Sequence, residues 1–151
     1  MAAIKEISGN LWDFHRGGKW IVIPTNGVIN SRGDAVMGAG LAKQAAERFP
    51  SLPRLLGQSL RSTGNTHYLF PSMRIITFPT KYHWRHSSDL TLIRTSIGRL
   101  ALALDRSNIE EVYCPRIGCG LGRLQWDVVR DAIAPLLTER FIFVRPNEGD
   151  S

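Results

Sequence analysis

Cysteine is scarce in this 151-residue sequence, which contains only Cys114 and Cys119. Two cysteines cannot form the disulfide framework of a small secreted domain, and they lack the second pair that a four-cysteine zinc site requires. No group of histidines, cysteines and carboxylates has the spacing of metal ligands. We therefore expect neither a metal nor a cofactor.

Long apolar runs are also absent. No stretch approaches the roughly 20 residues that a membrane-spanning helix needs, and the first residues, MAAIKEIS, contain no hydrophobic signal core. We therefore expect a cytoplasmic protein that does not contact a membrane. Apolar residues still make up 43 % of the chain, which is enough to bury a core. We expect a monomer with one domain at 1–145 and a polar tail at 146–151.

Negative charge is in the minority. The sequence has 19 lysines and arginines against 13 aspartates and glutamates, which gives a net charge of +6. This excess favours an anionic partner such as a nucleotide, a polyphosphate or a nucleic acid. The basic residues are dispersed, with local groups at Lys81–His86 and Arg116–Arg123.

Strand and helix patterns alternate along the chain. Short apolar runs predict strands at Ile4–Ile7, Trp20–Pro24, His67–Phe70, Arg74–Phe78, Glu111–Cys114 and Phe141–Val144. Helical periodicity predicts helices at about Gly38–Phe49, Pro53–Arg61, Ser88–Leu104 and Gln125–Leu137. Ser88 or Asp89 is the expected cap of the third helix, and Pro135 should weaken the end of the fourth. The alternation predicts an α/β fold in which a central mixed sheet lies between helices.

Two glycine-rich loops each follow a predicted strand and precede a helix. The first contains Thr25-Asn26-Gly27 and Gly33–Ala42, and the second is Pro115–Arg123. Glycine lets backbone N–H groups approach a phosphate closely, and a helix N-terminus adds favourable partial charge. Loops at the carboxyl ends of strands would form one crevice, the usual ligand site of an α/β sheet. The alternative is that these glycines only form turns and helix caps.

Neither loop matches the common nucleotide-binding motifs. The pattern G-x-x-x-x-G-K-[ST] is absent, which disfavours a Walker-type nucleoside triphosphatase. The run Gly118–Gly122 is not G-x-G-x-x-G, and no acidic residue follows at the spacing of a ribose-binding Rossmann unit.

Three segments together resemble a macrodomain, the ADP-ribose-binding fold. They are Gly9-Asn10-Leu11, then Pro24-Thr25-Asn26-Gly27 with Met37–Ala42, and Pro115–Leu121 continuing to Leu124-Gln125-Trp126. The last is very similar to the terminal ADP-ribose protein glycohydrolase type. Phe78–Arg85 resembles the macrodomain antitoxins that remove ADP-ribose from DNA bases. The resemblance extends over about Ile4 to Val144 and implies a three-layer α/β/α fold.

The resemblance also implies where ADP-ribose binds. Its diphosphate would lie between the two loops, with Asn26 near the distal ribose and Asn10 near the adenine. Asn10 replaces the aspartate that is usual in the family, so adenine recognition there would lack a charge. The implied binding residues are Asn10, Leu11, Thr25, Asn26, Val36, Met37, Gly38, Ala39, Gly40, Leu41, Pro115, Ile117, Gly118, Cys119, Gly120, Leu121 and Gly122.

Lys81 is the candidate nucleophile, because in the resembling hydrolases this lysine attacks the anomeric carbon of the distal ribose. Such an attack needs an unprotonated amine near neutral pH, and a partly desolvated site flanked by Arg85 or His83 would lower the pKa of Lys81. The alternative is a surface lysine that attracts phosphates or pairs with an acid. His83 is a second candidate, as acid or base, against an ordinary packing or solvent-facing role.

Gly122 departs from the glycohydrolase type, which carries an aspartate directly after Gly-Cys-Gly-Leu. The DNA-acting type tends to have a non-acidic residue there, so the change favours that branch. Asp34 could substitute for the missing acid, although a solvent-exposed turn explains it as well. Cys119 is interpreted as a small packing residue, since a thiolate nucleophile would need a base and a lowered pKa.

Three functions remain open. The first is an ADP-ribosyl hydrolase acting on modified nucleic acid or on a modified carboxylate of a protein, with Tyr82 and Trp84 stacking on a ribose or a base or merely covering the cleft. The second is a non-catalytic reader of ADP-ribose or its derivatives, which the absence of an acid at Gly122 favours. The third is a phosphatase acting on ADP-ribose 1″-phosphate.

Overall fold

The computed structural model describes residues 4–147. In this part of the chain one sheet has the strand order β1-β6-β5-β2-β4-β3. Only β3 runs antiparallel to its neighbour, and the other paired strands are parallel, so the expected mixed sheet is confirmed. The strands are β1 (Lys5–Ser8), β2 (Trp20–Thr25), β3 (Tyr68–Phe70), β4 (Ile75–Pro79), β5 (Val112–Pro115) and β6 (Phe141–Arg145).

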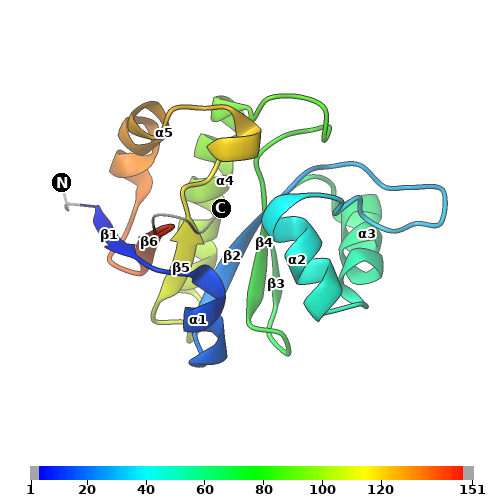
Figure 1. Ribbon diagram of the computed structural model, residues 1–151, viewed down its shortest axis with the longest axis horizontal. Helices are drawn as coiled ribbons and strands as arrows, with labels where there is room; N and C mark the ends of the chain where they lie inside the picture. The colour runs from blue at the N-terminus through cyan, green and yellow to red at the C-terminus, as the bar shows by residue number, and fades with distance from the viewer. Residues whose placement is uncertain (1–3, 148–151) are drawn as a thin grey trace.

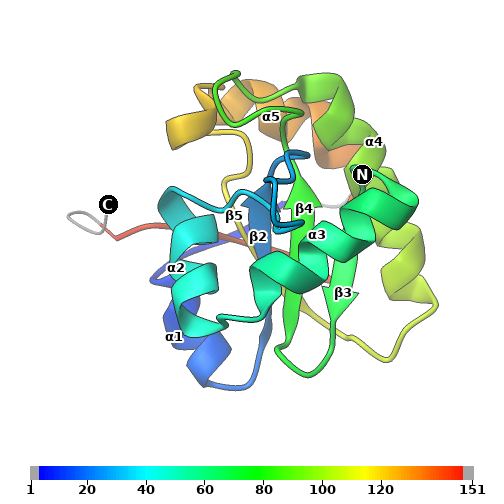
Figure 2. The same cartoon turned by 90° about the vertical axis from the view of Figure 1, so that its right-hand side faces the viewer.

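Helices cover both faces of the sheet (Figure 1). They are α1 (Leu11–Arg16), α2 (Gly40–Arg48), α3 (Leu52–Thr63), α4 (Leu90–Asp105) and α5 (Trp126–Ile133), with the 3₁₀ turns η1 (Gly120–Gly122) and η2 (Ala134–Leu136). Figure 2 shows α2 and α3 side by side on one face, with α4 and α5 beyond the sheet. The expected three-layer arrangement is therefore confirmed.

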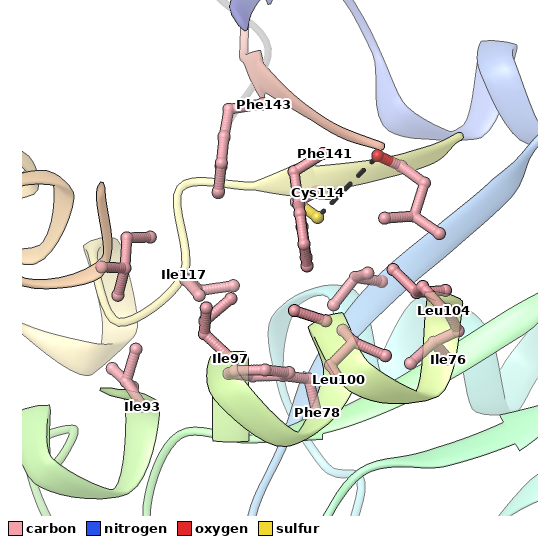
Figure 3. Packing of buried hydrophobic residues seen from close by; sticks show 14 of the residues in the cluster. Ile76, Phe78, Ile93, Ile97, Leu100, Leu104, Cys114, Ile117, Phe141 and Phe143 are labelled. Carbon is pink, nitrogen blue, oxygen red and sulfur yellow. Dashed lines mark hydrogen bonds between the residues drawn. The ribbon is translucent and has the colours of Figure 1, made fainter. Parts of the chain in front are cut away.

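Alternation along the strands produces two cores. In β2, Val22 packs with α4 and α5, whereas Ile21 and Ile23 pack with α1, α2 and α3. The same alternation holds along β4, β5 and β6, because successive side chains of a strand point to opposite faces. Figure 3 shows the first core, where Ile97 and Leu100 of α4 face the sheet residues Cys114 and Phe141.

Local chemistry sets the ends of α4 and α5. The Asp89 carboxylate accepts a hydrogen bond from the Leu92 N–H at 2.9 Å, so Asp89, rather than Ser88, caps α4. The last α5 residue is Ile133, and Pro135 lies in the 3₁₀ turn that follows. The predicted weakening of this end by Pro135 is therefore confirmed.

The sequence prediction missed α1, which has only six residues. A helix this short contains too few turns to display a helical period. Its signal was the cap, since the Asn10 side chain accepts from the Trp12 N–H at 2.9 Å. The helix buries Leu11 and Trp12 in the second core. Trp126 is partly buried against the first core.

The order of the strands positions the site. β5, β2 and β4 are neighbours in the sheet and all run parallel. Their carboxyl ends therefore meet at one edge, where three loops begin, at residues 26, 80 and 116. Ligands of open α/β sheets bind at such an edge.

Candidate functional site

A cavity of about 880 Å³ lies where these three loops meet. Both glycine-rich loops line it, and so does Lys81 of the segment that follows β4. The residues implied from the sequence that line the cavity are Thr25, Asn26, Val36, Gly38, Ala39, Gly40, Leu41, Lys81, Pro115, Gly118, Cys119, Gly120, Leu121 and Gly122.

Five other candidates do not line this cavity. Leu11, Met37 and Ile117 are buried in the two cores. The Asn10 side chain caps α1. His83 stacks on Trp84, with ring centroids 5.1 Å apart, and its Nδ1 accepts from the Arg85 N–H at 3.1 Å.

Sequence reasoning missed some residues that line the cavity. Six, counting Trp84, lie within the segments that the sequence motifs already marked, and their neighbours in the chain were the available signal. Ser88 and Pro146 lie farther from the motifs, and only the folded chain brings them to the cavity. Besides Trp84, for which stacking or covering the cleft was expected, the lining residues not assigned to the ADP-ribose site from the sequence are Pro24, Ala42, Thr80, Ser88, Arg116, Arg123 and Pro146.

The first glycine loop is anchored by side-chain and backbone contacts. The Asn26 Oδ1 accepts from the Val28 N–H at 2.9 Å, and its Nδ2 donates to the Val36 carbonyl at 3.1 Å. Asn26 therefore ties the two ends of this loop together, in addition to lining the cavity. Behind the loop, a Cβ on Gly57 of α3 would overlap the carbonyl oxygen of Gly33. Glycine at position 57 thus lets the loop pass close to α3.

The second glycine loop contains glycines of two kinds. Gly118 has a φ of +82°, and a Cβ there would lie 2.8 Å from the Ile93 Cδ1, so this residue is packed against α4. Gly120 has a φ of +62° but open space where its side chain would be. Gly38 in the first loop also faces open space. Gly38 and Gly120 line the cavity, so their missing side chains leave main-chain groups accessible to a ligand.

Lys81 is held by its neighbours on both sides. The Thr80 N–H donates to the Thr25 carbonyl at 3.0 Å, and the Asp89 N–H donates to the Thr80 carbonyl at 2.8 Å. The Asn65 Nδ2 donates to the carbonyl of Lys81 itself at 3.2 Å. These bonds fix the main chain at Lys81, although the segment 82–87 beyond it is largely exposed.

The electrostatic setting makes the neutral amine of Lys81 more accessible than that of a fully solvated lysine. Partial burial lowers the pKa of Lys81, and the nearby charge of Arg123 lowers this pKa further. The sequence had pointed to Arg85 or His83 as the cause, and Arg123 of the second loop has that role instead. Among the described residues, no carboxylate lines the cavity.

The remaining candidate groups have ordinary structural roles. Burial raises the pKa of the Cys119 thiol, and this side chain packs against the first core. A raised pKa disfavours a thiolate, in agreement with a packing role. Asp34 forms an exposed ion pair with Arg32 at 4.0 Å and does not line the cavity.

An aromatic and basic rim borders the cavity on the Lys81 side. Tyr82 and Trp84 are 58 % and 48 % exposed, and Trp84 lines the cavity. The Arg85 guanidinium lies over the Trp84 ring, 4.7 Å from its centroid. We call residues 82–86 the rim segment.

Within residues 4–147, no three or more His, Cys, Asp and Glu side chains come together as a metal site would require. No helix in the same range has the length and apolar character needed to cross a membrane.

Comparisons with known proteins agree on one family. DNA ADP-ribosyl glycohydrolase of Mycobacterium tuberculosis is 31 % identical over 107 residues, which cover 65 % of this chain and 30 % of that protein. The chain thus spans less than a third of this relative. ADP-ribose glycohydrolase OARD1 of Bos taurus is 33 % identical over 97 residues, or 64 % of this chain and 63 % of that protein.

A solved structure matches over almost the whole length. The macrodomain of Mycobacterium tuberculosis DarG has a TM-score of 0.76 and 27 % identity, over 97 % of this chain and 100 % of that one. The family model described as Macro domain matches residues 55–133. That range includes Lys81 and the second glycine loop. Because it takes in more than half of the sequence, the chain belongs to the Macro domain family.

Proposed function

We propose that this chain is an ADP-ribosyl hydrolase that binds ADP-ribose in the cavity and cleaves the glycosidic link at its distal ribose. One observation carries the proposal: Lys81, whose pKa is lowered, lines the same cavity as both glycine loops. A phosphate cradle and a nucleophile therefore share one space. The names of the two glycohydrolase relatives support the same reaction class.

The proposed reaction uses Lys81 as nucleophile. Its neutral Nζ attacks the anomeric carbon of the distal ribose, and the bond to the base or carboxylate breaks, with the electron pair leaving on that group together with a proton. The C–O bond of the ribose ring then opens, its oxygen takes up a proton, and a protonated Schiff base joins Lys81 to the sugar. Water adds to this carbon and expels the amine, which releases ADP-ribose and restores Lys81.

We propose modified DNA as the macromolecular substrate. The net charge of +6 favours a polyanion. The rim segment offers exposed Tyr82 and Trp84 rings that can stack on a base, beside the Arg85 guanidinium. DNA ADP-ribosyl glycohydrolase is also the name of the mycobacterial relative. An ADP-ribosylated carboxylate of a protein is the other substrate to be tested.

The experiment is a comparison of two substrates. The protein is incubated with ADP-ribosylated DNA and, separately, with glutamate-ADP-ribosylated protein, and released ADP-ribose is measured. We expect release from DNA, and borohydride added during turnover should trap a covalent adduct at Lys81, because a Schiff base is reducible. Release from the modified protein alone would contradict the DNA proposal while leaving the hydrolase proposal intact.

A reader of ADP-ribose is the second candidate function. No carboxylate among the described residues lines the cavity, so no such group is available there to activate water. If the protein binds ADP-ribose and releases none from either substrate, the reader function replaces the hydrolase. A phosphatase acting on ADP-ribose 1″-phosphate has less support, because Lys81 is better suited to a sugar carbon than to a phosphate.

We further propose that the domain comprises residues 1–145 and that 146–151 form a polar tail; positions 1–3 and 148–151 lie outside the described residues. Pro146 lines the cavity, so the start of this tail adjoins the site. The free thiols of Cys114 and Cys119 suit a reducing compartment, and we propose an antitoxin-like, cytoplasmic monomer.

A further inference from the structure

Ser88 is held between two parts of the site. Its N–H donates to the Gly122 carbonyl at 2.9 Å, which joins the segment after β4 to the second glycine loop. The Asp89 N–H donates to the Thr80 carbonyl. Because Lys81 follows Thr80 and Ser88 precedes Asp89, this bond brings the backbones of Lys81 and Ser88 close together. Both residues line the cavity.

The Ser88 hydroxyl is enclosed and lacks a hydrogen-bond partner in the described part of the chain. The residue is only 7 % exposed, and its Oγ makes no hydrogen bond to residues 4–147. A buried hydroxyl without a partner is unfavourable, and such groups in native proteins usually have a reason to be there. The Oγ itself has almost no accessible surface, so it must turn about the Cα–Cβ bond to enter the ligand-sized cavity that the residue lines, where an oxygen of a bound ligand is the natural acceptor.

The absence of a side chain at Gly122 leaves room for the Ser88 hydroxyl. Gly122 is buried, and a Cβ there would overlap the Ser88 Oγ and lie 3.1 Å from the Ser88 Cβ. The serine side chain therefore fills the space that any side chain at position 122 would need.

We propose that the Ser88 hydroxyl hydrogen-bonds the distal ribose and so distinguishes ADP-ribose from ADP. The inference rests on the proposed function in one respect, because Lys81 must act on the distal ribose for that sugar to lie beside Ser88. A serine hydroxyl is neutral, and it donates one hydrogen bond and accepts others. It therefore orients the sugar without adding a charge to the site.

Binding of two ligands tests the inference without requiring turnover. Calorimetry with ADP-ribose and with ADP, which lacks the distal ribose, is performed on the native protein and on Ser88→Ala. We expect Ser88→Ala to weaken ADP-ribose binding about fivefold to tenfold, the loss of one hydrogen bond, and to leave ADP binding within about twofold. Ser96→Ala is the matched control, because Ser96 is a buried serine on α4 that does not line the cavity. It should change neither affinity.

A second pair of variants tests the shared space. Gly122→Ala should lower the melting temperature, because its Cβ meets the Ser88 hydroxyl. Combining it with Ser88→Gly should restore the melting temperature but not the preference for ADP-ribose.

Equal losses for both ligands in Ser88→Ala, or no loss, would overturn the inference. A native protein that shows no turnover but loses its ADP-ribose preference in Ser88→Ala would contradict the hydrolase proposal alone. Failure of the native protein to bind ADP-ribose would overturn both.

Discussion

The cavity has one wall built mainly from backbone and another built from side chains. The glycine loops present main chain at Gly38 and Gly120, and they are fixed from behind by α3, α4 and the first core. The segment from residue 80 to 89 contributes Lys81, Trp84 and Ser88, and much of it is exposed. Main chain can bind a diphosphate whatever the attached group is, whereas the proposed cleavage requires one particular amine. Affinity and turnover should therefore be separable by mutation.

The largest expected effect, at Lys81, separates turnover from affinity. Lys81→Ala should lower turnover of ADP-ribosylated DNA by at least about a thousandfold, because the proposed nucleophile is removed. ADP-ribose affinity should change by less than about threefold, since in the proposed binding mode main-chain groups of the two loops supply most of the binding. Single-turnover release assays and calorimetry measure the two quantities.

Lys81→Arg is the matched variant that keeps the charge. It should also be inactive, because a guanidinium remains protonated and cannot attack the anomeric carbon. Turnover at the native rate in Lys81→Ala would show that another group carries the reaction.

A substitution in the wall built from backbone should impair ADP-ribose binding directly, unlike the substitution of Lys81. Gly38→Leu should weaken ADP-ribose binding about a hundredfold or more, because the new side chain enters the path of the diphosphate. The melting temperature should stay within about 2 °C, because nothing lies within 4 Å of the new Cβ. Gly98→Leu on α4 is the control, since Gly98 has equally open space but does not line the cavity. Unchanged affinity in Gly38→Leu would remove the first loop from the cradle.

The support behind that wall can be tested at Gly57. Gly57→Ala should lower the free energy of unfolding by about 1–3 kcal/mol, because the methyl group overlaps the backbone of Gly33 and must displace the first loop. ADP-ribose affinity should fall with it. Gly98→Ala should instead raise the free energy of unfolding by about 0.5–1 kcal/mol, as expected for an unobstructed glycine within a helix. Urea titrations give both values, and equal stability of the two variants would contradict the proposed support.

The fold could be predicted because its signals are local and repeated. A fully apolar strand such as Trp20–Ile23 indicates burial on both faces, and the structure assigns Val22 and Ile23 to opposite cores. The sequence prediction missed the short helix α1 because only its N-cap residue, Asn10, indicated a helix. The same asparagine was expected near the adenine. In the sequence, a single asparagine before a helix does not show whether its side chain caps the helix or contacts a ligand.

The site could be predicted only where its residues lie within motifs. The glycine loops and Lys81 were marked by their own neighbours in the sequence, and the structure brings them to one cavity. Arg123, which affects the pKa of Lys81 from 42 positions away, and Ser88, which fills the space beside Gly122, act through contacts between different loops. Such contacts depend on strand order, which a single sequence does not display.

The influence of Arg123 on Lys81 predicts a change in pH dependence. Arg123 lowers the pKa of Lys81, so Arg123→Gln should raise this pKa. Because the neutral amine reacts, activity rises as pH increases through the pKa of Lys81, and the acid limb of the profile should move to higher pH. The loss of activity should be greatest at low pH and should disappear at high pH. Arg85→Gln is the charge-matched control and should leave the limb in place, and an unshifted profile in Arg123→Gln would contradict the coupling.

The smallest expected effect concerns the choice of target at the rim segment. Arg85→Gln should raise the Michaelis constant for ADP-ribosylated DNA about twofold to fivefold at low salt, because one cation near the nucleic acid is lost. The difference from the native protein should shrink as salt increases, since counterion release contributes less there. Binding of free ADP-ribose should be unchanged, because Arg85 does not line the cavity. Arg94→Gln, an exposed arginine on α4 away from the cavity, is the control. Equal losses for DNA and free ADP-ribose would place Arg85 against the nucleotide and would remove the argument that the rim segment selects DNA.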